Sequence, residues 1–455
     1  MIEALVAAVA LGLLGHVLLT LWLMTYTWNH PERMAATRGP RCFRAPELGF
    51  TVLLPARDEE AVIAETVRKV AAVRYPSGLL EVRVICHADD ESTIDAARAA
   101  TAGCELVNVS VETFGGTPVN KPRGLNVGLA VSENEVVCVF DAEDDIHPDI
   151  FNVVNTVMLD EQVPVVQGGV QLVNMLDRWF SIHNCLEYYF WYKSRLHFHA
   201  GVGMIPLGGN TIFLRRGLVE RVGGWDDRCL TEDADIGMRI SALGVPIRVA
   251  YDQEWATREE TPVTVGALVR QRTRWHQGFL QVLGKADWRR VPGWRRRALA
   301  LFTFAQPLID AAVMCTLPLA IVGPFFGGPF LHRPPVYVAL LSFAPLYGLL
   351  LQMVTHMVGA RMFARDFGLK LPATTLCRFP LTHLLYQFLL GAAAVRAVAR
   401  HLYRRTDWEK TEHVGAHRSQ TVPVCQAPGP AVEGPADVPI PSLPSAASPR
   451  LESDA

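Results

Sequence analysis

Four short polar motifs follow one another in the middle of the chain, and their residue types suit transfer of a group from a phosphorylated donor. They are His87-Ala-Asp-Asp-Glu-Ser92, Phe140-Asp-Ala-Glu-Asp-Asp145, Thr231-Glu-Asp-Ala-Asp235 and Gln271-Arg-Thr-Arg-Trp275. Carboxylates can hold a divalent cation, and a further carboxylate can take the proton of an alcohol. An arginine beside an aromatic residue can bind phosphate and the face of a sugar.

Asp141 and Glu143 stand two positions apart, directly after a predicted buried strand over 136–140. Both side chains can therefore turn toward one point beyond the edge of the sheet. There they would coordinate Mg²⁺ or Mn²⁺, and the ion would also bind a diphosphate. The same residues also suit an acidic turn, which is the alternative interpretation.

Asp89 and Asp90 follow a second predicted strand, where a carboxylate can accept hydrogen bonds from a nucleotide base or ribose. Their alternative role is an acidic pair at the start of a helix over 93–100, where it would suit the helix dipole. Lys121, in Asn120-Lys-Pro-Arg-Gly-Leu-Asn126, could place a positive charge on the phosphates. A lysine in a loop can also simply be solvated.

Asp233 precedes a helix that we expect to begin near Ala234. An inverting transfer needs one base within hydrogen-bond reach of the acceptor hydroxyl, on the face opposite the leaving group. Asp233 is the candidate for that base. The alternative is a plain helix start, with Thr231 as the cap and acidic residues in the first turn.

Gln271, Arg274 and Trp275 fall on a predicted amphipathic helix. An arginine fork there could hold the pyrophosphate, and the indole could bind an acceptor sugar. A basic helix facing a membrane would have a similar sequence. Each motif has such an alternative, but all four occur in this order within one block, which favours a shared catalytic site.

The block from Phe50 to about Trp294 alternates stretches typical of strands and helices. Short apolar runs predict strands at 50–54, 82–86, 105–109, 136–140 and 164–168. Helical periodicity predicts helices at 59–73, 92–100 and 124–131. This alternation predicts an α/β fold with a mixed, mostly parallel sheet, and places ligands at the carboxyl ends of its strands.

Composition indicates one soluble domain combined with membrane helices. The chain has 455 residues, of which 50% are hydrophobic and 19% charged, and its mean hydropathy is +0.18. A net charge of -2 gives no reason to expect a nucleic-acid partner. The nine cysteines lie singly along the chain, which favours free thiols in a reducing compartment over a disulfide or zinc framework.

Apolar runs flank the soluble block. The run over 5–26 is followed by Arg33, Arg38, Arg41 and Arg44, which predicts an uncleaved anchor with its N-terminus outside the cell. The aromatic stretch over 179–199 suits either a core helix or one lying in the membrane interface.

Three further apolar stretches follow, at about 298–326, 336–358 and 373–398. Clusters of arginine mark cytoplasmic ends before the first stretch, after the second and after the third, yet three full crossings from the cytoplasm would leave the last cluster outside. Either the third stretch is re-entrant or interfacial, or the first is a split hairpin, or the end of the chain is external. We expect a transmembrane anchor over 1–28, a cytoplasmic catalytic domain over 46–294, transmembrane or interfacial helices over 298–400, a gating segment over 401–420 and a disordered tail rich in Pro, Ala and Ser over 421–455.

Residues 50–278 resemble the membrane-bound inverting glycosyltransferases of family 2, which include cellulose, hyaluronan and chitin-oligosaccharide synthases. Pro55-Ala-Arg-Asp-Glu-Glu60 is similar to the nucleotide loop after the first strand, and Leu207-Gly-Gly-Asn-Thr-Ile-Phe213 partly resembles the acceptor loop. Glu143 replaces the second Asp of the family's metal motif. Thr406-Asp-Trp-Glu-Lys-Thr-Glu-His413 resembles the family's gating loops, although a solvated segment next to the membrane is an equal alternative.

The resemblance implies a GT-A fold and assigns roles to residues of this chain. Asp233 is the implied catalytic base, and Asp141 and Glu143 are the implied metal ligands. The implied nucleotide-sugar ligands are Glu59, Asp89, Asp90, Lys121, Asp141, Gln271 and Arg274. The implied acceptor ligands are Trp275 and Glu232, and the gating residues would be Trp408, Lys410 and Thr411.

The expected function is transfer of a sugar from a nucleotide-sugar, with UDP as the expected nucleotide, to a growing β-linked polysaccharide at the cell membrane. Its partners would be the donor, a glycan or lipid-linked acceptor, membrane lipid and export or accessory proteins. One alternative is a single transfer to a polyprenyl or other lipid carrier. Another is a non-catalytic scaffold of an export assembly. A soluble nucleotidyltransferase is disfavoured because the chain has no Gly-rich phosphate loop.

Overall fold

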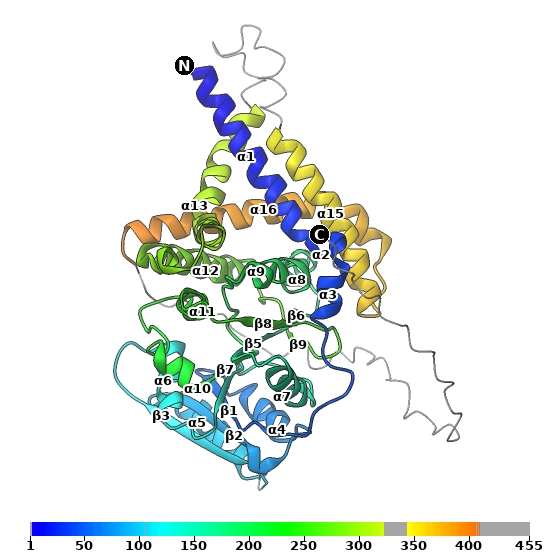
Figure 1. The fold of residues 1–455 in the computed structure, drawn as a ribbon. Coiled ribbons are helices and arrows are strands. Elements are labelled where there is room, and N and C mark those ends of the chain that lie inside the picture. Colours follow the sequence, from blue (N-terminus) through cyan, green and yellow to red (C-terminus); the bar gives the residue numbers. More distant parts are fainter. Residues whose placement is uncertain (1, 105, 323–343, 406, 408, 410–455) are drawn as a thin grey trace, which may run out of the picture. The chain divides into compact units, whose positions relative to one another are not determined.

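A seven-stranded sheet forms the strand-rich part of the chain (Figure 1), and the first two polar motifs follow its strands β2 and β4. The computed structural model describes residues 2–104, 106–322, 344–405, 407 and 409. The strands run in the order β3-β2-β1-β4-β7-β5-β8, and β7 is antiparallel to both of its neighbours. The strands are β1 (Phe50–Ala56), β2 (Leu80–His87), β3 (Asn108–Phe114), β4 (Val136–Val139), β5 (Val165–Gly168), β7 (Ile212–Arg215) and β8 (Ile247–Ala250). A separate parallel pair joins β6 (Val170–Leu172) to β9 (Thr257–Glu259).

Helices cover both faces of the sheet, which explains why its central strands are apolar along their whole length. One core packs α4, α5 and α7 against the sheet, and the other packs α6, α10 and α11 against its opposite face. The bounds of these helices are α4 (Ile63–Ala71), α5 (Glu91–Thr101), α6 (Lys121–Ala130), α7 (Ile150–Asp160), α10 (Arg216–Arg221) and α11 (Glu232–Ala242). Short 3-10 turns lie at η1 (Ser77–Leu79) and η3 (Asp287–Arg290).

The predicted α/β class with a mostly parallel sheet is confirmed, while individual strands differ. The strands expected at 50–54, 82–86, 136–140 and 164–168 are present. The strand expected at 105–109 begins three residues later, as β3. The strands β6 to β9 were not predicted, because runs of only three or four residues give too few positions for a recognisable alternation.

The remaining helices lie beside the strand-rich part of the chain in Figure 1. Two of them, over Trp294–Thr316 and Ala373–Leu402, are long and apolar enough to cross a membrane, judged by length and composition within the described residues. These remaining helices are α1 (Ile2–Met24), α2 (Tyr26–Asn29), α3 (Pro31–Ala36), α8 (Ser181–Phe190), the π-helical turn η2 (Trp191–Arg195), α9 (Leu196–Val202), α12 (Val265–Lys285), α13 (Trp294–Val322), α15 (Ala344–Asp366) and α16 (Ala373–Leu402).

The aromatic stretch expected at 179–199 forms α8, η2 and α9. Tyr189 and Phe190 are buried in a core that also contains Phe363 of α15. The described contacts therefore suit the core-helix alternative for this segment.

The helices α12 and α16 lie side by side and run in the same direction (Figure 1). Leu268 of α12 packs in one apolar cluster with Tyr386 of α16. Further along, Arg400 Nε of α16 donates to Gln277 Oε1 of α12 at 3.1 Å. Residue numbers rise together along both helices at these contacts, so α16 follows the surface of α12 for most of its length.

Candidate active site

The structure brings most of the predicted site residues around one cavity of about 920 Å³. They reach it from the ends of β1 and β4, from the first turns of α6 and α11, and from the middle of α12. Such convergence at strand ends and helix starts is what the fold class leads us to expect. The predicted residues that line the cavity are Glu59, Lys121, Asp141, Glu143, Glu232, Asp233, Gln271, Arg274 and Trp275.

Asp89 and Asp90 lie outside this cavity and line a smaller hollow of about 390 Å³ next to it. Arg57 and Asp58 line both spaces, so the two adjoin. The carboxylate of Asp90 accepts hydrogen bonds from the backbone N–H of Asp58 at 2.6 Å and of Thr93 at 3.3 Å. Asp90 therefore caps α5, as its alternative role requires, while the side chain of Asp89 remains 61% exposed.

Asp141 and Glu143 both face the cavity and can supply oxygen ligands to a divalent cation. Within the described residues, no group of three or more His, Cys, Asp or Glu side chains is arranged to hold a metal ion. A pair of carboxylates suits Mg²⁺ or Mn²⁺ bound together with a substrate diphosphate, because such ions take most of their other ligands from phosphate and water.

Lys121 supplies a cation beside these carboxylates. Its Nζ donates to Asp141 and to the carbonyl oxygen of Gly209 at 2.8 Å. Burial opposes the charged form of Lys121, but nearby carboxylates, with Asp141 first, outweigh it and raise the lysine pKa. Lys121 therefore stays charged at neutral pH, next to the place where donor phosphates would meet the cation.

A buried polar group behind Asp141 was missed in the sequence. The carboxylate of Asp144 accepts from the Asp141 N–H at 2.8 Å and from Asn210 Nδ2 at 2.8 and 2.9 Å. Asn210 also donates to Glu259 of β9. Burial raises the pKa of Asp144 well above its ordinary value. Asn210 lies in the segment that only partly resembles the acceptor loop, and this was the available signal for it.

Asp233 occupies the first turn of α11, which begins at Glu232 rather than near Ala234. Its Oδ1 accepts from the Ala234 N–H at 2.8 Å. The hydroxyl of Thr231 makes no capping hydrogen bond, so the cap proposed as the alternative for this motif is not formed. A methyl group built at Gly209 would lie 3.3 Å from Asp233 Oδ2 and 3.6 Å from Lys121 Nζ, so one backbone turn lies next to both groups.

The two adjacent carboxyls of α11 have altered acidity. Burial raises the pKa of Asp233, against the opposing effects of the Ala234 N–H, Lys121 and Arg274. Burial, followed by the charge of Asp233, raises the pKa of Glu232 to about 7. A carboxylate whose pKa lies nearer to neutrality is a stronger base, which suits removal of a proton from an alcohol.

Arg274 lies among the acidic groups of the cavity. Burial lowers its pKa, while Glu232, Asp233 and Asp141 oppose that shift, in that order. Because an arginine remains charged at neutral pH in any case, Arg274 adds a fixed positive charge beside the metal-site carboxylates. Its neighbour Gln271 is oriented by a hydrogen bond of 3.1 Å from Arg272 Nη1 to its Oε1.

Arg272 fixes the position of Trp275, although sequence reasoning gave it no role. Its guanidinium carbon lies 4.1 Å from the centre of the Trp275 ring, which is a cation–π contact. Arg272 Nη2 also donates to Glu187 of α8 at 2.6 Å, and Tyr386 of α16 donates to the same carboxylate. The indole is thus held from one side by an arginine whose Nη1 and Nη2 are both hydrogen-bonded.

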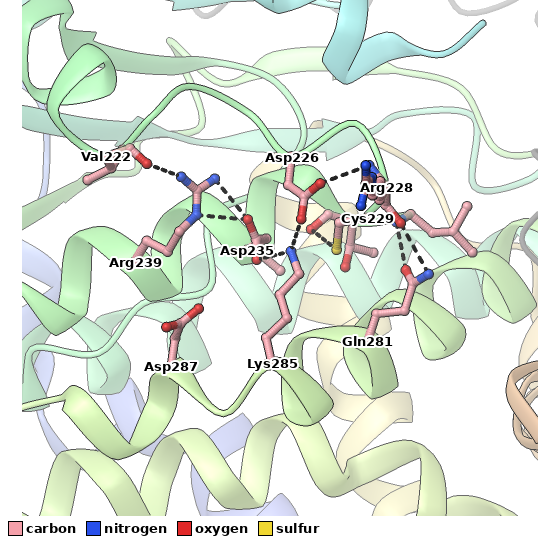
Figure 2. Close-up of polar contacts among 12 residues, drawn as sticks. Val222, Asp226, Arg228, Cys229, Asp235, Arg239, Gln281, Lys285 and Asp287 are labelled. Carbon is pink, nitrogen blue, oxygen red and sulfur yellow. Dashed lines mark hydrogen bonds and ion pairs between the residues drawn. The ribbon is translucent and has the colours of Figure 1, made fainter. Parts of the chain in front are cut away.

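Figure 2 shows the polar network that joins α11 to the end of α12. Lys285 Nζ of α12 contacts Asp226 at 2.5 Å and Asp235 of α11 at 2.6 Å. Arg239 Nε binds Asp235 at 2.9 Å. Gln281 of α12 accepts from the N–H of Leu230 at 2.8 Å. These bonds set the position of Asp233 relative to Arg274, since each residue is fixed on one of the two joined helices.

Asn126 of α6 makes a second connection to the segment that precedes α11. Its side chain accepts from the Trp225 N–H at 2.9 Å and donates to the Trp225 carbonyl at 2.7 Å. Asn120 Nδ2 donates to the carbonyl of Asp227 at 2.7 Å. The helix that begins with Lys121 is thereby tied to the loop that leads to Asp233.

The expected gating residues Trp408, Lys410 and Thr411 lie outside the described residues. Of the same segment, Glu409 is described, and its carboxylate contacts Arg396 at 2.6 Å and Arg400 at 3.2 Å. Asp407 also contacts Arg400, at 3.2 Å. Both acidic residues are therefore held at the end of α16.

The sequence matches the family model described as glycosyltransferase like family 2 over residues 46–278. The probable glycosyltransferase YdaM of Bacillus subtilis is 29% identical over 249 residues, which cover 52% of this chain and 56% of that protein. This chain thus spans about half the length of the Bacillus relative. The beta-monoglucosyldiacylglycerol synthase of Trichormus variabilis is 26% identical over 381 residues, which cover 80% of this chain and 76% of that protein.

Among solved structures, the mannosyltransferase PcManGT from Pyrobaculum calidifontis, in complex with GDP-Man and Mn²⁺, matches with a TM-score of 0.53 and 19% identity. The match covers 89% of this chain and 100% of the other, and it shows the GT-A fold. Membership in an enzyme family removes the non-catalytic scaffold from the candidates. The chain belongs to the glycosyltransferase-like family 2 and is a hexosyltransferase.

Proposed function

We propose that the protein is a membrane-embedded inverting transferase, and that its acceptor reaches the catalytic base from among the membrane helices. One observation carries this proposal: the cavity that contains Asp141, Asp233 and Arg274 is also lined by residues of α1, α13, α15 and α16. A donor site on the sheet and an acceptor path between helices therefore share one space.

In this proposal Asp233 takes the proton from the acceptor hydroxyl, which then attacks the anomeric carbon of the donor sugar. Lys121 and Arg274 lie close to Asp141 and would bind the negative charge that develops on the departing nucleoside diphosphate. Asp141 and Glu143 would hold Mg²⁺ or Mn²⁺, which would supply further neutralisation of that diphosphate. Attack opposite the leaving group inverts the anomeric centre and forms a β-linkage from an α-linked donor.

The donor is a UDP-sugar in this proposal, with Glu59 and Gln271 as further donor ligands. Glu59 and Gln271 are buried and line the cavity, Glu59 from the loop after β1 and Gln271 from α12. Asp89 is proposed to reach the base or ribose from the adjoining hollow, while Asp90 shapes that hollow as the cap of α5.

The growing β-linked glycan is the acceptor that the motif Gln271-Arg-Thr-Arg-Trp275 favours. Trp275 is half-buried at the cavity and is stacked from one side by Arg272. A held indole can bind the apolar face of a sugar ring, and Glu232, beside the base, can accept a hydrogen bond from a sugar hydroxyl.

A single transfer to a lipid is the second candidate. The helical part of the cavity has apolar walls, including Val17 and Leu21 of α1, Val313 of α13, and Phe388 of α16. These walls suit hydrocarbon chains better than a glycan. The beta-monoglucosyldiacylglycerol synthase of Trichormus variabilis aligns with 80% of this chain, which supports a glycerolipid acceptor.

The test is nucleotide release by the detergent-purified full chain with UDP- and GDP-sugars, with Mg²⁺ or Mn²⁺ and with a chelator. We expect release with one sugar, loss of release in chelator, and recovery on addition of metal. Asp233→Asn should bind the nucleotide normally but lose about 10²–10⁴-fold in turnover, which is the usual contribution of a general base. Glu220→Gln, on the exposed side of α10, is the matched control. Substantial turnover by Asp233→Asn would contradict the role of Asp233.

A further inference from the structure

The helical part of the cavity contains a polar cluster that the proposed catalytic steps do not use. Gln306 Nε2 of α13 lies 3.0 Å from Asp310 Oδ1 and 3.2 Å from His16 Nε2 of α1. His16 Nε2 lies 4.0 Å from the same Asp310 oxygen. All three residues line the cavity, together with Arg195 of η2.

The cluster includes polar side chains of an apolar helix, where such side chains are energetically unfavourable. Gln306 and Asp310 lie within Trp294–Thr316, one of the segments apolar and long enough to cross a membrane. An ionisable side chain in such a segment costs several kcal/mol unless it faces a protein interior or an aqueous cavity, where it commonly has a binding role. Asp310 keeps 30% of its side chain accessible and lines the cavity, so its carboxylate is available to a molecule in that space.

The cluster also has unused hydrogen-bonding capacity. In the described part of the chain, His16 Nδ1 and Gln306 Oε1 have no hydrogen-bond partner, and neither does Thr20 Oγ1, one helical turn from His16. Buried polar atoms left without a partner destabilise a fold, so they mark this part of the cavity as polar. These three atoms have almost no accessible surface, so a bound hydroxyl group would reach the cluster through the accessible carboxylate of Asp310.

We propose that His16, Gln306 and Asp310 form a subsite that binds hydroxyl groups of an uncharged acceptor on the helical side of the catalytic centre. The assignment rests on the proposed function and specifies its acceptor class. Asp310 accepts hydrogen bonds from hydroxyls and repels phosphate. Arg195 balances the charge of Asp310 instead of supplying a net positive site: burial lowers the pKa of Arg195, and Asp310 counters that shift.

Two sources of acceptor share this chemistry: the terminal sugar of a glycan and the glycerol backbone of a neutral lipid. A polyprenyl phosphate fits this subsite less well, because its phosphate would lie against the carboxylate of Asp310 at a place where Arg195 leaves no net positive charge. The subsite thus favours uncharged acceptors over negatively charged ones, whatever their chain length or linkage.

The test compares Gln306→Leu and Asp310→Asn with the wild type, using the full chain in lipid nanodiscs. The acceptors are diacylglycerol, a short neutral oligosaccharide and polyprenyl phosphate. We expect KM for the acceptor to rise about tenfold in Gln306→Leu, as expected for loss of one or two hydrogen bonds. The donor KM, and nucleotide release without acceptor, should stay within about twofold of wild type, since neither involves this subsite. Thr316→Val, an exposed polar position of the same helix, is the matched control.

The outcomes separate this inference from the function on which it rests. If the wild type transfers sugar but both variants keep its acceptor KM, the subsite is wrong and the transferase stands. If the wild type transfers only to polyprenyl phosphate, the uncharged acceptor class is wrong. If the wild type transfers to none of the acceptors and releases no nucleotide, the proposed function fails and the subsite fails with it. Asp310→Asn preserves the shape of the side chain and removes only its charge. If Gln306→Leu proves unstable, Asp310→Asn therefore still tests the subsite.

Discussion

Lys285 at the end of α12 donates to Asp235 of α11 at 2.6 Å, and Asp235 is only 1% exposed. This buried contact fixes the helix that carries Asp233 against the helix that carries Arg274. The base and the leaving-group cation therefore depend on a residue that touches neither substrate. Lys285 acts as a positioning residue in the proposed reaction.

We expect Lys285→Met to lower kcat about tenfold and to leave donor KM within about twofold, because the donor ligands stay in place while the base moves. Asp235 keeps its bonds to Arg239, so the loss of stability should be about 1–3 kcal/mol rather than that of an isolated buried charge. Turnover and thermal unfolding of the same preparation measure both effects. Arg290→Ala, at an exposed arginine nearby, should change neither, and an unchanged kcat in Lys285→Met would refute the positioning role.

The pH dependence of turnover should report the carboxyl pair of α11. Asp233 must be charged to take a proton, and burial raises its pKa, so activity should fall at a higher pH than for an ordinary carboxylate. The charge of Asp233 raises the pKa of Glu232, so Asp233 is the first of the two carboxyls to ionise. Glu232 is therefore still neutral while Asp233 titrates, and Glu232→Gln should leave the acidic limb of kcat within about 0.5 pH units of its wild-type position. Glu135→Gln, at an exposed surface site, should not shift the limb either, and a shift of about one unit or more in Glu232→Gln would show that Glu232 and not Asp233 sets the limb.

Two glycines of α12 offer a matched pair for the packing of α11 on α12. A methyl group at Gly278 would lie 2.4 Å from Thr231 Oγ1, whereas one at Gly284 meets nothing within 4 Å. Gly278→Ala should lower the free energy of unfolding by about 1–3 kcal/mol through overpacking. Gly284→Ala should raise it by about 0.5–1 kcal/mol through helix propensity. Thermal melts of the two variants check this, and equal effects would show that the contact with Thr231 does not limit the packing.

The parallel course of α16 along α12 favours an interfacial α16 among the alternatives left open by the arginine clusters. In that arrangement α13 leaves the cytoplasm, α15 returns, and all three arginine clusters lie on the cytoplasmic side. Tyr403, just beyond α16, is 79% exposed. In a variant without native cysteines, Tyr403→Cys should react with a membrane-impermeant thiol reagent only after cells are opened. Glu91→Cys, on an exposed site of α5, should behave in the same way, while labelling of Tyr403→Cys in intact cells would show that α16 crosses.

The sequence predicted which residues share a cavity better than it predicted the contacts that support them. Asp141, Asp233 and Arg274 stand in motifs whose spacing is itself the signal, and all three line the same cavity. Asn210 and Arg272 could not be found in that way. Their roles depend on partners from distant segments, such as Asp144 and Glu187, and no local spacing encodes those contacts.

The lack of information about distant contacts in the local sequence also explains the error in the predicted start of one strand. The strand β3 begins three residues later than expected, because Leu106 and Val107 resemble a strand start while the pairing with β2 fixes the real register. The cap formed by Asp90 is a local contact, because the N–H that its carboxylate accepts belongs to the nearby Thr93. Local sequence can therefore predict the cap, but it does not show whether the carboxylate caps the helix or binds a ligand.

The contacts of α12 also determine which parts of the chain can be produced as separate fragments. One side of the helix is bound to α11 through Lys285 and to the preceding Leu230 through Gln281. Another side is covered by α16 through Leu268, Thr273 and Gln277. A truncation after Trp294 would remove α16 and expose an apolar surface together with the side chain of Gln277. We therefore expect the catalytic half to be unstable without α16, so that assays, ligand screens and crystallisation should start from the full chain.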